Sequence, residues 1–381
     1  MLLINRILFA ELSETCRLQP AIPVILFLLA GATGSGIMID QTVPAPSPVL
    51  TLAHVVVIMM ENEGINQTYN CGVNCDYITS LANLYGLAEN LSSVAHNSLP
   101  DYLTFLNGSN FAYPGSAFGN FCSPSNCRVN GTNILDEISG SGRTWRAYLE
   151  DYVGGCQFTN VAGHRSVEYD DAHNPFVYMA EAHSSPAYCT NLIDANPTST
   201  GYLALPTTLL SDLNNIAIPA PNFIWLTPNN CDNGHDNNAT ITFYNTASIC
   251  PLSSTVQEQN IYLKALVPAI LNSTTFTTSG SLLLITWDEG VACTPTNDPA
   301  YPETFPVCID RVTTIFAGSN AQPHHISNKG YSHYGFLPTL EEVWSLAPLG
   351  GQIEGPTFDE FLAPMPSTPQ GGGGIGRHLL V

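Results

Sequence analysis

The sequence has few charged residues and very few basic ones. Only 11% of its 381 residues are charged, and 10 Lys and Arg stand against 31 Asp and Glu, which gives a net charge of -21. Nucleic-acid phosphates would repel such a chain, and no basic stripe offers a local exception, so the composition excludes nucleic acid as a partner. A shortage of charge of both signs suits a medium in which carboxylates are often protonated. We therefore expect a protein that works outside the cell at low pH.

The sequence also lacks a long membrane-spanning run. Its apolar stretch at residues 21–32 is shorter than the roughly 20 residues that a span needs, and Arg6 and Arg17 precede it. This pattern predicts a signal peptide or an N-terminal anchor over residues 1–38, with its cleavage and the true start codon left open. We further predict a proline-rich linker over 39–50, a folded domain over 51–363 and a flexible Pro/Gly-rich tail over 364–381.

No CxxC pair occurs among the 11 cysteines, which argues against a thiolate zinc site. Cys16 lies in the predicted targeting segment, and the ten others form an even set that favours disulfides in an exported chain. We predict that sequential neighbours pair: Cys71 with Cys75, Cys122 with Cys127, Cys156 with Cys189, Cys231 with Cys250, and Cys293 with Cys308. Six Asn-X-Ser/Thr sequons are compatible with a secreted glycoprotein.

Short apolar runs predict an α/β fold. Four of them, at residues 54–60, 222–227, 281–287 and 312–316, are rich in β-branched residues and apolar on both faces, as in the middle of a covered sheet. Helical patterns occur between or after them, at residues 102–106, 144–152, 255–271 and 337–346. The remaining sequence is rich in Asn, Gly, Pro and Cys, so we expect long loops that decorate the sheet.

Three of the four predicted strands end in groups that bind metal or phosphate. Glu61-Asn62-Glu63 follows the first strand, residues 228–236 with His235 and Asp236 follow the second, and Asp288-Glu289 follows the third. Ligands of open α/β sheets lie beyond the carboxyl ends of the strands. Hard oxygens with one or two imidazoles suit Mg, Ca, Mn or Zn, and they suit neither a thiolate site nor haem.

A candidate nucleophile follows the first strand. In residues 96–103 the chain turns through Pro100 into a predicted helix, which places Ser98 near the helix N-cap. Backbone N–H groups and the helix dipole favour an anion there. Ser98 can equally be a capping serine, and this octapeptide alone favours that interpretation.

An ordered set of motifs resembles a known family. The motifs are residues 54–62, 96–103, 173–176, 221–236, 285–290 and 332–334. Together they resemble the phosphoesterase family of bacterial acid phosphatases and phosphatidylcholine-type phospholipases C, within the alkaline phosphatase superfamily. The resemblance covers roughly residues 50–346. It implies an alkaline-phosphatase-like three-layer sandwich with a central mixed, mostly parallel sheet and long disulfide-pinned loops.

The same resemblance implies roles for individual residues. Ser98 would be the nucleophile, with His235 and His333 as catalytic partners that stabilise or protonate the leaving oxygen. The expected metal ligands are Glu61, Asn62, Asp288 and Glu289, and the expected phosphate or substrate contacts are His96, His173 and Asp236. Asp101 stands where the family usually has Asn, and Glu63 with its two successors departs from the usual continuation. These departures affect substrate preference more than reaction type.

We therefore expect an extracellular, metal-dependent acid phosphatase that hydrolyses phosphomonoesters through a phosphoserine. A bound divalent cation would activate the serine and offset phosphoryl charge. One alternative is a phospholipase C-type phosphodiesterase acting on lipid head groups. Another is a non-catalytic secreted glycoprotein of the same fold. The partner would be a small phosphoester or a phospholipid, with a membrane tether if the N-terminal segment stays. The substrate, the number and identity of the metals and the oligomeric state are left open.

Overall fold

The computed structural model describes residues 52–109, 122–154, 156, 168–199, 201–241, 247–290, 295–296, 307–308 and 310–363. All of them lie in one compact unit, residues 47–381. The predicted N-terminal segment 1–38, the linker 39–50 and the tail 364–381 lie outside the described residues. Among the helices that are described, none is long and apolar enough to cross a membrane.

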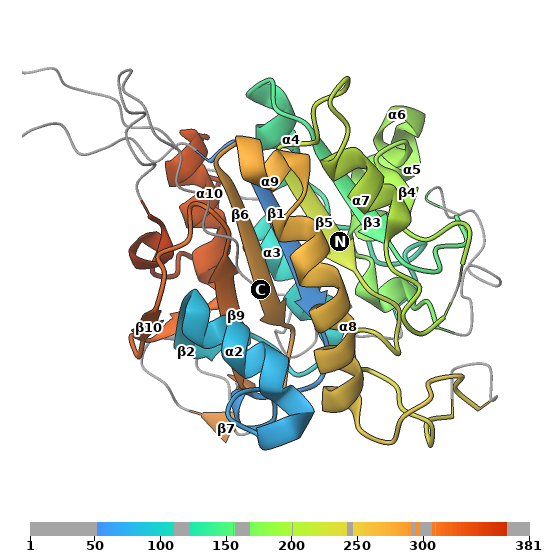
Figure 1. The fold of residues 1–381 in the computed structure, drawn as a ribbon. Coiled ribbons are helices and arrows are strands. Elements are labelled where there is room, and N and C mark those ends of the chain that lie inside the picture. Colours follow the sequence, from blue (N-terminus) through green and yellow to red (C-terminus); the bar gives the residue numbers. More distant parts are fainter. Residues whose placement is uncertain are drawn as a thin grey trace, which may run out of the picture. The chain divides into compact units, whose positions relative to one another are not determined.

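A nine-stranded sheet forms the centre of this unit (Figure 1). Its strand order is β10-β2-β9-β6-β1-β5-β3-β4, with β11 paired to β2. Only β9 runs against the others, so the described sheet is mixed and mostly parallel, as predicted. The strands are β1 (His54–Met60), β2 (Gly86–Ser92), β3 (Trp145–Leu149), β4 (Leu192–Asp194), β5 (Phe223–Thr227), β6 (Ser281–Trp287), β9 (Arg311–Ala317), β10 (His325–Ser327) and β11 (Tyr331–Ser332). A separate two-stranded sheet pairs β7 (Pro295–Thr296) with β8 (Val307–Cys308).

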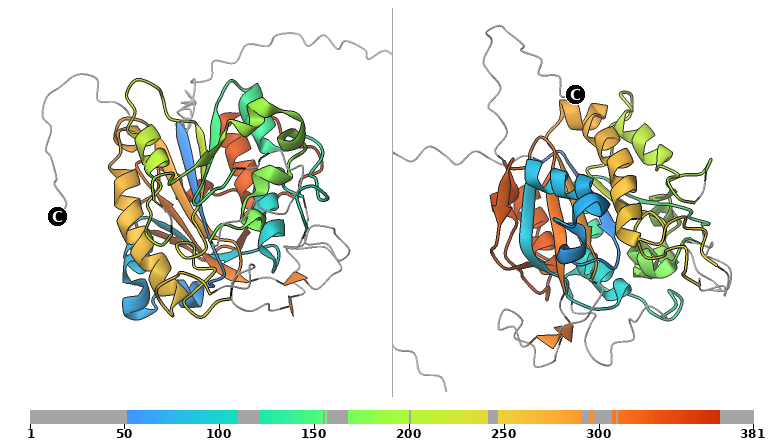
Figure 2. Two further views of the ribbon diagram at one scale, coloured as in Figure 1. Left: turned by 90° about the vertical axis from the view of Figure 1, so that its right-hand side faces the viewer. Right: turned by 60° about the horizontal axis from the view of Figure 1, so that its bottom comes forward.

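Helices cover both faces of the sheet and make the three layers that Figure 2 shows edge-on. One layer holds α2 (Asp76–Leu84), α7 (Thr207–Leu213), α8 (Thr255–Leu271) and α9 (Thr274–Thr278). The other holds α3 (Ser98–Asn107), α4 (Ile134–Gly140) and α10 (Phe336–Trp344). The shorter helices are α1 (Ile65–Thr68), α5 (Ala180–Ser184) and α6 (Pro186–Cys189), and the 3₁₀ turns are η1 (Gly72–Cys75), η2 (Asp171–His173), η3 (Pro175–Tyr178), η4 (His333–Gly335) and η5 (Asp359–Phe361).

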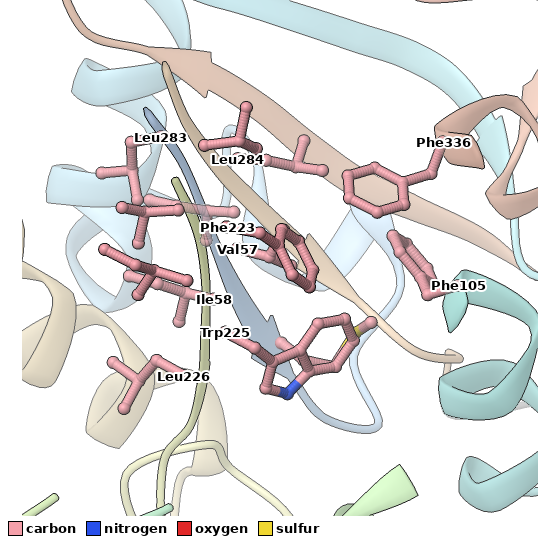
Figure 3. Close-up of a cluster of buried hydrophobic side chains, with 14 of the residues drawn as sticks. Val57, Ile58, Phe105, Phe223, Trp225, Leu226, Leu283, Leu284 and Phe336 are labelled. Atoms are coloured by element: carbon pink, nitrogen blue, oxygen red, sulfur yellow. The ribbon is translucent and has the colours of Figure 1, made fainter. Parts of the chain in front are cut away.

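The sheet is apolar on both faces because each face has a helical layer to bury. Val57 pairs in register with Trp225 and Leu284, and this face packs against Phe105 of α3, whose ring centroid lies 5.8 Å from that of Trp225 (Figure 3). Ile58, the next residue of β1, points to the opposite face, as alternate residues of a strand do. Continuous apolar strands of this kind are typical of the middle of an α/β sheet.

One predicted helix is wrong. Residues 144–152 contain β3, which pairs in parallel with β5 and β4. The strand within it is only five residues long and carries Trp145 and Tyr148, and aromatic residues favour strands. Pairing with a neighbouring strand therefore overrides the weak helical pattern. The correction matters for the site, because it places Glu150 and Asp151 at the end of a strand.

Four of the five predicted disulfides are present. They join Cys71 to Cys75, Cys122 to Cys127, Cys156 to Cys189 and Cys231 to Cys250. The fifth predicted pair, Cys293 with Cys308, includes a residue that lies outside the described part of the chain. The four bonds pin loops around the sheet, in agreement with the sequential pairing that the sequence predicted.

Candidate active site

Glu61 is the first residue after β1, and several side chains contact its carboxylate. The Tyr102 hydroxyl donates to Oε1 at 2.6 Å, and His173 Nε2 lies 3.4 Å from the same oxygen. The Ser98 hydroxyl donates to Oε2 at 3.2 Å. Burial and then the nearby charge of Asp288 raise the pKa of Glu61 well above its usual value. A buried acid therefore faces the candidate nucleophile.

Ser98 is the first residue of α3, and its hydroxyl contacts this acid instead of capping the helix. The N-cap position belongs to Asn97, whose side chain makes no capping hydrogen bond. Pro100 lies in the first turn, where its missing N–H breaks no helical hydrogen bond. The capping interpretation of Ser98 is therefore wrong, and the buried hydroxyl lies between Glu61 and Asp288.

Asn62 connects the ends of β1 and β6. Its backbone N–H donates to Asp288 Oδ1 at 3.1 Å, and its side-chain amide donates to Glu61 Oε2 at 3.2 Å. The residue has a positive φ of 55°, a left-handed conformation that Asn tolerates better than most residues. This local turn brings the acids of two neighbouring strands together.

Asp288 and Glu289 follow β6, and each keeps one oxygen that no group of the described chain satisfies. Asp288 Oδ2 and Glu289 Oε2 are both buried and have no hydrogen-bond partner among the described residues. Burial raises the pKa of Asp288, and hydrogen bonds from neighbouring groups, Ser98 among them, oppose part of that rise. Burial and the charges of Asp288 and Asp310 raise the pKa of Glu289 to about 9. Buried acceptors without donors are costly in a protein, so this pair is poised for a positively charged ligand.

Two partly exposed histidines at this edge each contact an aspartate. His96 Nδ1 lies 2.9 Å from Asp310 Oδ2 and 3.7 Å from Glu289 Oε2. His235 Nδ1 lies 2.7 Å from Asp236 Oδ1. Burial lowers the pKa of His235, but the hydrogen bond and charge of Asp236 outweigh that effect and raise it overall. Each carboxylate fixes the orientation of its imidazole ring.

His173 is more deeply buried and lies between His235 and Glu61. Its ring stacks on Tyr102 with centroids 5.7 Å apart, and it lies 4.9 Å from the ring of His235. Its Nδ1 is 3.1 Å from the Asn230 side-chain oxygen. The two motifs that contain His173 and His235 therefore meet beside the carboxylate that Ser98 contacts.

His333 is also at this edge, but both of its ring nitrogens are engaged. Nδ1 lies 3.1 Å from Asp101 Oδ1, and Nε2 lies 3.0 Å from the backbone oxygen of Trp287. Burial lowers the pKa of His333 to about 3 and raises that of Asp101 well above its usual value. The fully buried His333 thus links α3 to the end of β6, and it presents no unengaged nitrogen to Ser98.

A sequence profile of the phosphoesterase family matches residues 71–347. The chain belongs to the phosphoesterase family. A phosphatidylinositol-3-phosphatase of Mycobacterium tuberculosis is 24% identical over 350 residues, which are 91% of this chain and 95% of that protein. The crystal structure of a protein in the alkaline phosphatase superfamily from Vibrio parahaemolyticus shares the fold, with a TM-score of 0.52 at 11% identity over 77% of this chain and 66% of its own. This phosphoesterase is a phosphoric ester hydrolase.

Sequence reasoning missed two residues of the candidate site. Tyr102 was part of a predicted helix, but nothing in its spacing signalled that its hydroxyl reaches Glu61. Asp310 directly precedes β9, the strand that runs against its neighbours, so the start of this strand meets the carboxyl ends of the others. An acidic residue just before the strand predicted at residues 312–316 was the available signal, but it needed the strand direction.

A second group of buried acids lies beyond β3 and β5. We call Glu150, Asp151 and Asp232 the support carboxylates, because protein donors contact each of them. Glu150 accepts from the Tyr262 hydroxyl at 2.7 Å, and Asp232 accepts from the Leu203 N–H at 2.9 Å. Burial raises the pKa of Asp232 to about 8. Glu150 and Asp151 were hidden from sequence reasoning by the wrong helix.

The candidate site is better suited to a divalent cation than the one cluster of described residues that contains cysteines. The buried oxygens Asp288 Oδ2 and Glu289 Oε2 accept no hydrogen bond from the described residues, and carboxylate oxygens are the hard ligands that such cations prefer. Within the described residues, Glu168, Cys231 and Cys250 also lie within 4.8 Å of one another. The two cysteines of that group form a disulfide, so they offer no thiolate ligands.

Proposed function

We propose that this phosphoesterase is an extracellular, metal-dependent acid phosphatase that hydrolyses phosphomonoesters through a phosphoserine on Ser98. The position of the Ser98 hydroxyl carries the proposal. Ser98 is the first residue of a ten-residue helix. Its hydroxyl donates to Glu61 at 3.2 Å and lies beside Asp288. A helix N-terminus favours a bound phosphoryl group, and the adjacent acids can hold a cation beside the hydroxyl.

Glu61, Asn62, Asp288 and Glu289 would hold the divalent cation. When bound, it supplies positive charge that favours ionisation of the serine and offsets charge on the phosphoryl oxygens. This role for the acids is supported by two of their buried oxygens, which accept no hydrogen bond from the part of the chain that the structure describes. Their raised pKa values reflect burial and mutual repulsion, both of which a cation would relieve.

Ser98 would attack phosphorus in line, and the leaving oxygen would take a proton from His235. The raised pKa of His235 keeps its imidazole protonated over a wider range of acidic pH, which suits that task. Asp236 orients this ring, and His96 and His173 would contact phosphoryl oxygens. Water would then hydrolyse the phosphoserine.

His333 receives a different role from the one that the resemblance implied. Because both ring nitrogens are engaged, we assign it to holding α3 against the end of β6. Asp101, the residue that departs from the family pattern, is its partner in α3. The Asp at position 101, where the family usually has Asn, therefore makes a structural contact with His333 behind Ser98.

The monoester is favoured over the diester by the mycobacterial relative, whose name denotes removal of a phosphate monoester from a lipid head group. An extracellular location is supported by the four disulfides, which persist in oxidising compartments. Low-pH operation is supported by the many buried carboxyls with raised pKa values. The N-terminal segment would serve as an export signal or a membrane tether.

The test is a substrate panel assayed from pH 4 to 8 with and without added Mg²⁺, Ca²⁺, Mn²⁺ and Zn²⁺. It compares soluble phosphomonoesters, phosphatidylinositol 3-phosphate in vesicles and phosphatidylcholine as a diester. We expect metal-stimulated monoester hydrolysis, fastest in acid, and a phosphopeptide containing Ser98 after acid quenching. Turnover of phosphatidylcholine without monoester hydrolysis would establish the phospholipase C alternative. Rapid turnover with no labelled Ser98 peptide would indicate direct attack by water.

A further inference from the structure

Gln259 of α8 lies buried behind the site and is hydrogen-bonded at every polar group of its side chain. Its Nε2 donates to the backbone oxygen of Glu61 at 2.8 Å and to that of Asn233 at 2.7 Å. Its Oε1 accepts from the Trp287 indole N–H at 3.1 Å. An amide side chain presents two donors and one acceptor together, whereas a carboxylate or a hydrocarbon side chain does not.

The three partners of Gln259 belong to the three strand ends that carry the site. Glu61 follows β1, Trp287 ends β6 directly before Asp288, and Asn233 lies in the loop after β5 that leads to His235. The backbone N–H of Glu61 also donates to the Asn233 oxygen at 3.0 Å. One side chain thus connects the metal-binding side of the site to the histidine side.

The loop after β5 is shaped to admit this side chain. Gly234 has a φ of +85°, and a Cβ at this position would come within 2.1 Å of Gln259 Nε2. A glycine is therefore needed both for the left-handed backbone and for the close approach of the amide. The amide and the glycine therefore fit each other in the buried interior of the protein.

We propose that Gln259 is a positioning residue, which sets the spacing between the Ser98-side carboxylates and His235 by fixing the ends of β1, β5 and β6 to α8. This role rests on the proposed function, since it concerns the separation of the groups that ionise the serine and protonate the leaving oxygen. A shift of about 1 Å in such a spacing can slow turnover roughly 100-fold without contact between the residue and the substrate.

Asn260, the next residue of α8, is a matched control. It is also buried and also makes three hydrogen bonds, but all of them go to α2. Its Oδ1 accepts from the N–H groups of Tyr77 and Ile78 at 3.0 and 3.1 Å, and its Nδ2 donates to Asp76 at 2.9 Å. Asn260→Leu removes the same number of contacts from the same helix without touching a strand end that carries the site.

The experiment compares Gln259→Met, Gln259→Glu and Asn260→Leu with wild type in kcat, KM, melting temperature and metal affinity by calorimetry. We expect Gln259→Met to lower kcat about 10- to 100-fold and to weaken metal binding, with KM changed less than kcat. Gln259→Glu keeps the acceptor for Trp287 and, when protonated, offers one donor in place of two, so it should recover part of kcat only at low pH. Asn260→Leu should lower the melting temperature similarly while kcat stays within about threefold of wild type.

Equal kcat in Gln259→Met and Asn260→Leu at equal stability would overturn the positioning role. Gln259→Glu, assayed at low pH, carries the same comparison if Gln259→Met does not fold, since a protonated carboxyl has nearly the native shape, one donor and one acceptor. The wild-type assay separates this result from a failure of the proposed function. A wild type without metal-dependent monoester hydrolysis refutes that function and the positioning role with it, whereas an active wild type with unaffected Gln259 variants refutes only the latter.

Discussion

Two groups of buried acids lie at the carboxyl ends of neighbouring strands, and they differ in how their oxygens are satisfied. The site carboxylates are Glu61, Asp288 and Glu289. The support carboxylates are Glu150, Asp151 and Asp232. All six are at most 7% exposed, so burial does not distinguish the groups. Burial also raises the pKa of all six, so raised pKa values do not distinguish them either.

Hydrogen bonding distinguishes Asp288 and Glu289 from the support carboxylates, whereas Glu61 accepts hydrogen bonds on both oxygens as the support carboxylates do. Glu150 has donors on both oxygens, from the Tyr262 hydroxyl and the Asn229 N–H, and Asp232 likewise accepts on both. Asp288 and Glu289 each keep one buried oxygen without a donor in the described structure. A carboxylate whose oxygens all accept hydrogen bonds stabilises the loops that donate them. A buried carboxylate oxygen without a donor is available to a ligand. The comparison teaches that unsatisfied oxygens, and neither acidity nor burial, separate Asp288 and Glu289 from the support carboxylates. They do not define the site alone, because Asp101, Glu181 and Glu258 each keep one such oxygen in the described structure as well.

The largest effect is expected for Ser98→Ala, which removes the hydroxyl between two site carboxylates. We expect kcat to fall by about a thousandfold or more, with metal binding retained because the acids remain. Ser273→Ala is the control, since Ser273 is equally buried but caps α9 through the Phe276 N–H. It should cost about 1 kcal/mol of stability and leave kcat unchanged. A folded Ser98→Ala enzyme with near-normal turnover would place the nucleophile elsewhere.

The next effect concerns the support carboxylates and pH. Asp232 has a folded-state pKa of about 8 against an ordinary value of 3.8. An acid with a raised pKa leaves the fold fully stable below about pH 4, and its contribution is lost as pH rises through about 8. We therefore expect the free energy of unfolding of wild type to fall by on the order of 3 kcal/mol between pH 5 and 8 because of this residue. In Asp232→Asn this part of the pH-dependent loss of stability should be absent.

Urea unfolding of both proteins at pH 5, 6.5 and 8, in metal-free buffer, measures this difference. The metal-free condition keeps the site carboxylates equal in the two proteins. Identical pH slopes in wild type and Asp232→Asn would show that Asp232 is not protonated in the fold.

Much of the fold can be predicted from the sequence, because an apolar strand is recognisable from its own short run of residues. β1, β6 and α8 were predicted with the bounds that the structure shows, and the strand predicted at residues 312–316 lies within β9. β2 was missed. It carries Glu89 and Asn90, which are partly exposed, and its pairing with β9 shifts register between Ala88 and Leu91. A polar, irregular strand lacks the periodic pattern on which sequence reasoning depends.

Residues of the candidate site could be proposed from the sequence where they come shortly after a predicted strand. Glu61, Asp288 and His235 could be proposed because each lies within a few residues of an apolar run or a motif. Asp310 and Gln259 could not, because their positions depend on strand direction and on the packing of α8. Contacts between distant segments carry no local signal, and residues that act through such contacts are the ones that sequence reasoning misses.

A smaller effect is expected when one site carboxylate loses its charge. Asp288→Asn should weaken divalent-metal binding about 10- to 100-fold, so added metal should restore part of the activity. Asp232→Asn, its counterpart among the support carboxylates, should leave the metal requirement unchanged. The measurement is activity against free metal concentration for both variants. A shifted metal requirement in both would mean that the two groups of acids act as one site.

The smallest and most closely matched effect comes from two tyrosines. Tyr102 donates to Glu61 at 2.6 Å and Tyr262 donates to Glu150 at 2.7 Å, and both rings are fully buried. Replacing either by Phe leaves a buried carboxylate with one donor fewer and should cost about 1–3 kcal/mol of stability. Tyr262→Phe should keep kcat/KM within about twofold, because Glu150 only braces the fold. Tyr102→Phe should lower kcat/KM roughly tenfold, because Glu61 also orients the Ser98 hydroxyl. Equal loss of stability with unequal loss of activity, measured by urea unfolding and initial rates on the same preparations, supports the division into two groups, whereas equal losses of both would contradict it.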